Sequence, residues 1–119
     1  MVLSLDVIGA IRLGLESYRN YVQNKKTEEL QRKLDCTIIK MYYFGQVGGK
    51  AVTGYGLHVT TEEELNSVEE LSKMDQFNAI RMGKARGLIK DDYTHNGNRW
   101  YLTREGVMYA KALLEETNK

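Results

Sequence analysis

Hydrophobic side chains recur every three or four positions over the first part of the chain, which is the spacing of one face of an α-helix. Behind Ser4, a residue type that favours helix N-termini, such a stripe predicts a helix over residues 4–23. A second stripe behind Thr27 predicts a helix over residues 27–44. Residues 45–59 contain five glycines among β-favouring residues, so they predict a loop with at most one short strand.

Two capping boxes follow close together, each with a hydroxyl residue and a glutamate three positions later. They pair Thr61 with Glu64 and Ser67 with Glu70. Their position predicts either one helix within residues 61–74 or a shorter helix whose start the pattern leaves open.

The next helix is expected over residues 75–87, with Asp75 as its N-cap. Gly87 would end it, because glycine adopts the left-handed conformation of a helix end at least cost. In an alternative register this helix begins at Ser72 and includes Lys73.

Two short β-prone runs come next, at residues 88–91 and 99–102. The Asn96–Gly97 pair between them favours a tight turn, so the segment predicts a β-hairpin with a polar tip. Thr103 then caps a last amphipathic helix that carries Val107, Ala110, Leu113 and Leu114 on its apolar side.

The composition is that of one globular domain over residues 1–119, with 42% hydrophobic and 28% charged residues. No apolar run approaches the roughly 20 residues of a membrane span. Asp6 and Arg12 interrupt the N-terminal apolar stretch, which makes it a poor signal peptide. With a lone Cys36, which has no partner for an internal disulfide, these features predict a cytoplasmic protein that does not enter a membrane.

Charge is unevenly distributed along the chain, although the net charge is only +1. Residues 61–75 contain six acidic side chains and one basic one, a sum of −5, whereas residues 76–102 contain five basic and two acidic ones, a sum of +3. The cationic block therefore lies on the predicted helix and hairpin. The acidic cluster Glu62–Glu64 would repel phosphate, so a DNA-binding function requires it to face away from the DNA.

Two segments resemble the winged helix-turn-helix family: Lys84-Ala-Arg-Gly-Leu-Ile-Lys90, and Trp100-Tyr-Leu-Thr-Arg-Glu-Gly-Val-Met-Tyr-Ala-Lys-Ala-Leu-Leu114. The resemblance covers about residues 60–117. It implies a mainly α fold with a small β-hairpin, made of an N-terminal helix (1–26), a winged-helix core (27–102) and a C-terminal helix (103–119). Gly83 departs from the family, which often has a bulky apolar residue there, so this helix either packs unusually close or ends near Met82.

The resemblance implies a sequence-specific regulator of transcription, a dimeric repressor whose recognition helix enters the major groove of double-stranded DNA. Amide side chains suit adenine and guanidinium groups suit guanine, and a small polar hairpin suits the backbone or minor groove. The residues expected to contact DNA are Lys73, Gln76, Asn78, Arg81, Lys84, Arg86, His95, Asn96 and Arg99.

The N-terminal helix lies outside the winged unit, and in such proteins added helices commonly build a two-fold homodimer. The residues expected at that interface are Val7, Ile8, Ile11, Leu15, Tyr18 and Leu113. Two plainer interpretations stay open: the helix covers the core of its own subunit, and the cationic helix face is merely solvated. The alternative function is a winged-helix module that binds a protein and not DNA.

Catalysis has little support in the sequence. Gly45 to Ala51 superficially resembles a phosphate loop but has the wrong glycine spacing and lacks the Ser or Thr that meets magnesium. His58, His95 and Cys36 are scattered over different elements, so no metal site is expected. We therefore predict that the protein is not an enzyme and needs no cofactor, and the sequence does not indicate whether a small effector binds.

Overall fold

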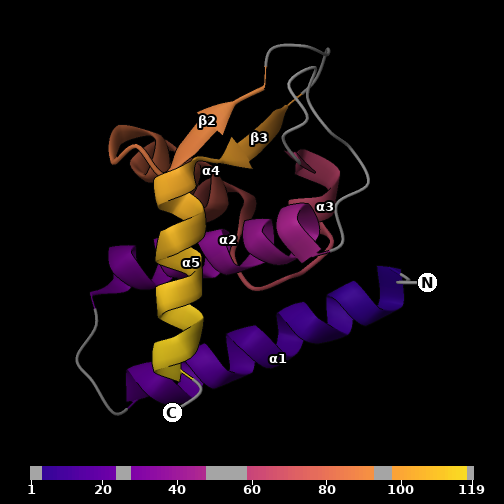
Figure 1. Ribbon diagram of the computed structural model, residues 1–119, viewed down its shortest axis with the longest axis vertical. Coiled ribbons are helices and arrows are strands. Elements are labelled where there is room, and N and C mark those ends of the chain that lie inside the picture. The colour runs from indigo at the N-terminus through magenta and orange to yellow at the C-terminus, as the bar shows by residue number, and fades with distance from the viewer. Residues whose placement is uncertain (1–3, 24–27, 48–58, 93–97, 118–119) are drawn as a thin grey trace.

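The computed structural model describes residues 4–23, 28–47, 59–92 and 98–117 (Figure 1). These residues form a mainly helical chain with a small three-stranded antiparallel sheet, which confirms the prediction of a mainly α fold with a small β element. The elements in chain order are α1 (Ser4–Gln23), α2 (Glu29–Met41), the π-helical segment η1 (Tyr42–Val47), β1 (Thr60–Thr61), α3 (Glu62–Asn66), α4 (Lys73–Ala85), β2 (Ile89–Asp91), β3 (Arg99–Leu102) and α5 (Arg104–Thr117).

The first two helices follow the apolar stripes of the sequence. Helix α1 has the predicted bounds, and α2 begins slightly later than predicted, with Glu28 at its N-cap in an extended conformation. The predicted cap, Thr27, lies outside the described residues. The α2 ribbon continues into η1 as far as Val47, so the expected loop begins later than the glycine-rich composition suggested.

The two predicted capping boxes behave differently. Thr61 caps α3 as predicted: its hydroxyl accepts a hydrogen bond from the Glu64 amide, and the Glu64 side chain accepts one from the Thr61 amide. The second box does not form, because Ser67 is the C-cap of α3 and donates its hydroxyl proton to the Glu64 carbonyl oxygen. The segment from 67 to 72 is therefore the turn between two helices.

Helix α4 starts earlier than its expected N-cap. The predicted cap at Asp75 is wrong, since Ser72 occupies the N-cap and accepts a hydrogen bond from the Asp75 amide, as in the alternative register. Gly87 follows the helix with φ at +74°, which confirms the predicted left-handed end.

The sheet has the order β1-β3-β2, so its central strand is the last in sequence. Strand β3 pairs with β1 through Thr60↔Trp100 and with β2 through Lys90↔Tyr101. The predicted hairpin strands are present, β2 beginning at Ile89, but the Asn96–Gly97 turn lies outside the described residues. The short strand β1 is a third member that hairpin signals alone did not indicate.

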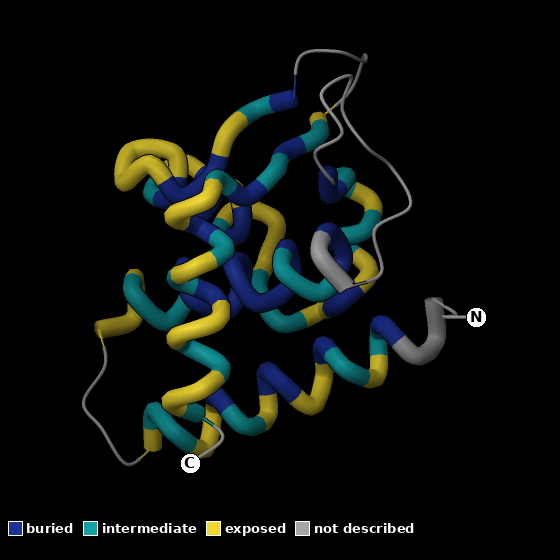
Figure 2. The backbone as a smooth tube through the Cα atoms, in the orientation of Figure 1, coloured by how far each residue is buried: buried dark blue, intermediate teal, exposed yellow. Residues whose placement is uncertain are grey.

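Helix α2 lies between two hydrophobic clusters. One side packs against α4, the sheet and α5, and includes Leu34, Ile38, Ile80, Trp100 and Leu102. The other side packs against α1, whose buried residues recur once per turn from Val7 to Tyr18 (Figure 2). Among the described residues, no helix is long and apolar enough to cross a membrane.

The stripe predicted as a dimer interface lies in this second cluster. Val7, Ile11, Leu15 and Tyr18 are buried inside their own chain, while Ile8 and Leu113 are half-buried. The stripe packs inward because α2 has apolar residues on this side as well, including Ile39. Helix α1 thus covers the core of its own subunit, which was the plainer of the two interpretations.

Two glycines allow close contacts between α4, α5 and the segment that joins α4 to β2. A Cβ on Gly83 would overlap the Ile89 side chain, so α4 packs closely at this point and continues to Ala85 instead of ending near Met82. A Cβ on Gly106 would overlap the carbonyl oxygen of Leu88. That oxygen is held in place because it accepts a hydrogen bond from the Thr103 amide.

We expect Gly106→Ala to lower the free energy of unfolding by about 3 kcal/mol, because a backbone oxygen cannot move aside as a side chain can. Gly9→Ala is the matched control: Gly9 is exposed within α1 and has open space around it, so alanine should raise stability by about 0.5–1 kcal/mol. Urea denaturation of both variants measures the two effects, and equal stability of the variants would contradict the close contact.

Candidate functional site

Helix α4 has a buried side and a fully exposed side. The buried side is made of Gln76, Ala79, Ile80 and Gly83, and it lies against α2 and β2. The opposite side is exposed along the whole helix and carries Lys73, Met74, Phe77, Asn78, Arg81, Lys84 and Ala85. This exposed side is the candidate site, and we call it the α4 face.

Three of the residues predicted to contact DNA stand free on the α4 face. Lys73 and Arg81 form no ion pair with any residue that the structure describes, and Asn78 is exposed beside them. The Arg81 guanidinium lies 6.0 Å from the centre of the Phe77 ring, within the range of a cation–π contact. The face therefore presents two cations and an amide to solvent.

Two further predicted residues lie at the end of α4 and are partly engaged. Lys84 forms an ion pair of 2.7 Å with Asp91 at the end of β2. Arg86, just after the helix, donates a hydrogen bond of 2.9 Å to Gln31 of α2. Both residues are exposed. The charge of Lys84 is met by Asp91, whereas Arg86 bonds to a neutral amide and keeps its positive charge at the end of the helix.

Gln76 was predicted to contact DNA, and the structure places it in the interior. It is only 4% exposed. Its side-chain oxygen accepts a hydrogen bond from Lys40, and its amide nitrogen donates one to Asn66. Gln76 is on the buried side of α4 because it shares a helix face with Ala79 and Ile80, and this face packs against α2 and β2.

The Lys40 ammonium group is buried in the centre of the chain, with a residue exposure of 0%. It donates hydrogen bonds of 2.9 Å to the Val68 carbonyl oxygen and to the Gln76 side chain. Burial lowers the pKa of Lys40, because the charged form loses its hydration. Its two hydrogen bonds tie α2 to the α3–α4 turn and to the first half of α4.

The buried carboxylate of Asp35 links the end of α4 to helices α1 and α5. Asp35 accepts hydrogen bonds from the hydroxyls of Tyr18 in α1 and Tyr109 in α5, and from the amide of Gln31. Burial raises the pKa of both tyrosines, and the hydrogen bond to Asp35 raises it further. Since Gln31 also holds Arg86, this network reaches the end of α4.

The base of the hairpin is less cationic than the sequence suggested. Arg99 is largely buried and faces Asp92 at 3.4 Å, with side-chain exposures of 12% and 1%, so it is not a surface cation. Glu62 accepts a hydrogen bond from Asn98, which brings one residue of the acidic cluster beside the hairpin. The remaining predicted contacts, His95 and Asn96, lie outside the described residues.

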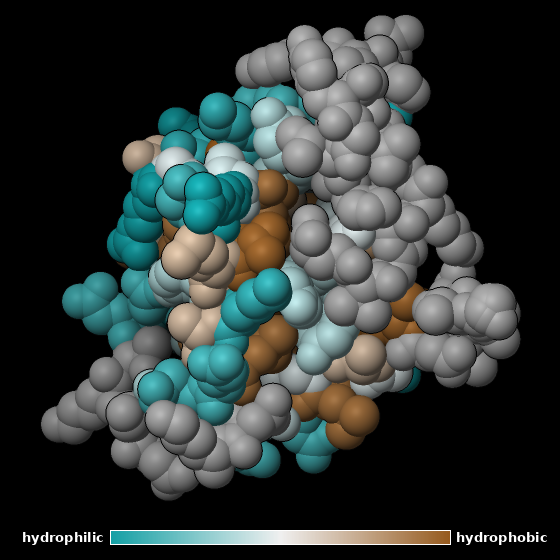
Figure 3. Space-filling view, in the orientation of Figure 1, coloured by the Kyte–Doolittle hydropathy of each residue, from teal (hydrophilic) through white to brown (hydrophobic). Residues whose placement is uncertain are grey.

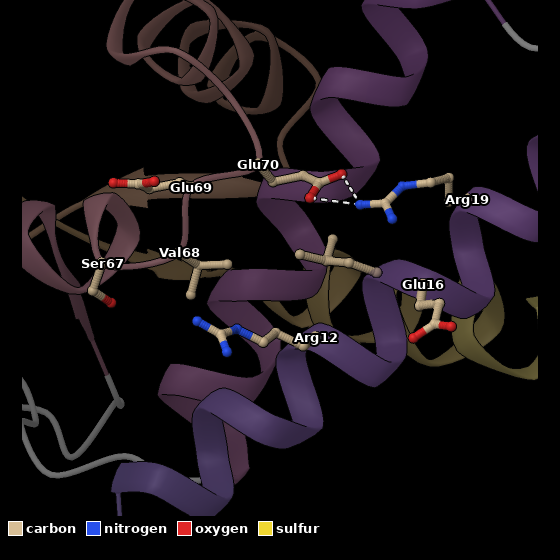
Figure 4. A pocket seen from close by; sticks show the side chains of 8 residues that line it. Arg12, Glu16, Arg19, Ser67, Val68, Glu69 and Glu70 are labelled. Atoms are coloured by element: carbon tan, nitrogen blue, oxygen red, sulfur yellow. Dashed lines mark hydrogen bonds and ion pairs between the residues drawn. The ribbon is translucent and has the colours of Figure 1, made fainter.

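A separate groove of about 670 Å³ lies between α1 and the α3–α4 turn (Figure 4). Arg19 and Glu70 form an ion pair of 2.7 Å in it, and Arg12 points toward Ser67 and Val68. Glu16 and Glu69 also line it, so cations and carboxylates alternate. Because positive and negative side chains are mixed, the groove has no uniformly positive potential that would attract a polyanion. The α4 face is better suited to binding a polyanion.

Other chemistry has little support in the described parts of the chain. They contain no group of three or more histidine, cysteine or acidic residues that is placed to hold a metal ion. Cys36 is buried, and burial raises the pKa of its thiol to about 11, which keeps it in the unreactive neutral form.

Sequence reasoning missed two residues of the α4 face. Met74 and Phe77 are 69% and 53% exposed, although both are large and hydrophobic. Met74 and Phe77 are three positions apart, and Arg81 follows four positions later. In a helix that begins after Ser72, which was the alternative prediction, all three side chains lie on one face.

Comparisons of the chain with protein-family models, with curated proteins and with solved structures find no match. The function is therefore argued from the α4 face itself.

The two amides of α4 should behave differently when they are replaced. Gln76→Ala removes an acceptor from a buried ammonium group, so we expect it to lower the free energy of unfolding by about 2–3 kcal/mol. Asn78→Ala, on the exposed side of the same helix, should change stability by less than about 0.5 kcal/mol. Urea denaturation tests both, and equal effects would contradict the placement of Gln76.

Proposed function

We propose that the protein is a winged helix-turn-helix regulator of transcription that binds double-stranded DNA with α4 in the major groove. The support for the fold is the order α2, β1, α3, α4, β2, β3 together with the strand order β1-β3-β2. In this assignment α3 and α4 are the helix-turn-helix and the β2–β3 hairpin is the wing. The sequence resemblance over residues 60–117 points to the same family.

The observation that carries the proposal is the free polar surface of α4. A helix fits the major groove when one side is held by its domain and the other carries donors that reach base edges. Arg81 can donate two hydrogen bonds to guanine, Asn78 can pair with adenine, and Lys73 is suited to phosphate. All three are exposed on a helix that hydrogen bonds fix to the core at both ends.

The wing has a smaller role in this proposal than the sequence suggested. Arg99 is paired with Asp92 and is not free to meet phosphate, and Glu62 lies beside Asn98. Lys90 of β2 is exposed, so it is the described residue of the hairpin that can reach phosphate. Affinity would then come mainly from α4. We expect modest binding to non-specific DNA, since few phosphates would be neutralised.

The proposal includes action as a homodimeric repressor, with two copies of α4 on a two-fold symmetric DNA site. Because the predicted stripe of α1 is buried, a dimer built on the added helices would use other residues. On the face that carries α5, hydrophobic residues border this helix and continue toward α1 (Figure 3). Leu13 and Met108 are the large exposed hydrophobic residues of α1 and α5.

The second candidate function is a module that binds a protein partner through the α4 face. The exposure of Met74 and Phe77 favours it, because exposed apolar side chains are typical of protein interfaces. Lys73 and Arg81, which have no acidic partner among the described residues, favour a polyanion instead, and for that reason DNA is the first candidate.

We expect the protein to bind duplex DNA, with an affinity that falls as the salt concentration rises and a slope set by the few phosphates neutralised. Lys73→Ala and Arg81→Ala should each weaken binding at least about fivefold, because each removes a charge-assisted contact. Fluorescence anisotropy with a labelled random-sequence duplex at several salt concentrations measures these effects.

Lys111→Ala is the matched control, since Lys111 is exposed on α5, away from the α4 face, and should leave affinity nearly unchanged. Affinity that does not depend on salt, or that Lys111→Ala lowers as much as Arg81→Ala does, would contradict the proposal. The solution mass of the protein, free and on DNA, tests the homodimer.

A further inference from the structure

The apolar pair Met74 and Phe77 lies in the first half of α4, on the outermost line of the helix. Residues 74, 77 and 81 are spaced by three and four, so they form one stripe, and the buried residues 76, 79, 80 and 83 lie on the opposite side. In a recognition helix the first half is the part that contacts base edges. The side chains nearest to the bases would therefore be hydrophobic.

Packing within the chain does not require these two side chains. Phe77 is 53% exposed and Met74 is 69% exposed, and neither belongs to the two core clusters. The Phe77 ring lies 6.0 Å from the Arg81 guanidinium. Phe77 therefore lies beside a cation at the surface. This position suits contact with an apolar group of a negatively charged partner.

Base edges offer few apolar groups in the major groove. Guanine, adenine and unmodified cytosine present hydrogen-bond donors and acceptors there, whereas thymine adds a C5-methyl group. A 5-methylcytosine presents the same methyl group at the same place. A phenyl ring pressed against the other base edges would cover polar atoms without bonding to them, which is unfavourable.

We propose that Phe77, assisted by Met74, contacts the C5-methyl group of a pyrimidine in the major groove, so that the protein prefers DNA that carries this methyl group. The inference rests on the proposed DNA-binding function and assigns a specificity-determining role to Phe77. It favours DNA over a protein partner because Lys73 and Arg81, which have no acidic partner among the described residues, lie beside the apolar pair on the same face.

The experiment compares duplexes that differ only in the methyl group. The probes are alternating dA-dT and dA-dU duplexes, and alternating dG-dC duplexes with cytosine or with 5-methylcytosine. Wild-type protein should bind the dA-dT duplex about three- to fivefold more tightly than the dA-dU duplex for each methyl group contacted. The 5-methylcytosine duplex tests whether the methyl group is read in a G·C pair as well.

The variants separate methyl recognition from general affinity. Phe77→Ala should bind the dA-dT and dA-dU duplexes equally, whereas Phe77→Leu should keep part of the preference, since it retains an apolar side chain. Leu30→Ala is the control for loss of an exposed apolar side chain elsewhere, because Leu30 of α2 is 58% exposed and has no role in the proposed binding, and it should keep the full wild-type ratio. Circular dichroism of each variant checks that α4 is still folded.

The outcomes distinguish this inference from the proposed function. Equal wild-type affinity for the dA-dT and dA-dU duplexes, or an undiminished preference in Phe77→Ala, overturns methyl recognition and leaves DNA binding in place. Absence of binding to all four duplexes overturns both methyl recognition and the proposed DNA binding. It favours a protein partner that contacts Met74 and Phe77. A preference for thymine that does not extend to 5-methylcytosine supports the inference and limits it to A·T pairs.

Discussion

The burial of α2 on all its sides is the constraint on which the rest of the structure depends. Eight consecutive residues, Leu34–Met41, are buried, so this helix needs neighbours in every direction. Helix α1 covers one side, α4 and the sheet cover the other, and α5 contributes residues to both clusters. Two of the buried residues are charged in water, and each is met by hydrogen bonds: Asp35 by two tyrosines and an amide, Lys40 by a carbonyl oxygen and Gln76. Burying such groups is tolerated only when they are bonded in this way.

These polar contacts also fix α4. Lys40 holds Gln76 in its first half, Gln31 holds Arg86 just after its end, and Lys33 of α2 forms an ion pair of 3.1 Å with Asp75. A recognition surface gains from such support, because side chains held in place lose less entropy on binding. Helices α1 and α5 therefore contribute to the α4 face indirectly, by completing the core that orients it.

The tertiary structure also explains how a nearly neutral chain presents a cationic face. The acidic segment 61–75 meets cations from elsewhere: Glu70 pairs with Arg19 and Asp75 with Lys33. Glu64 is used in the capping box of α3. Lys73 and Arg81 are left without an acidic partner among the described residues, so the α4 face is positive locally although the net charge is only +1.

The sequence by itself determined the elements, because helix stripes, capping residues and the left-handed Gly87 act over a few neighbouring positions. It identified α1, Thr61 as a cap, the two hairpin strands and α5 at nearly their final bounds. Only the tertiary structure decided which side of each element is free. Gln76 and Arg99 are interior residues because Lys40 and Asp92 lie opposite them, and the α1 stripe is buried because α2 has a second apolar side. Met74 and Phe77 are exposed because the opposite side of α4 packs against α2 and β2. The local pattern does not contain these facts, since each depends on a residue distant in sequence.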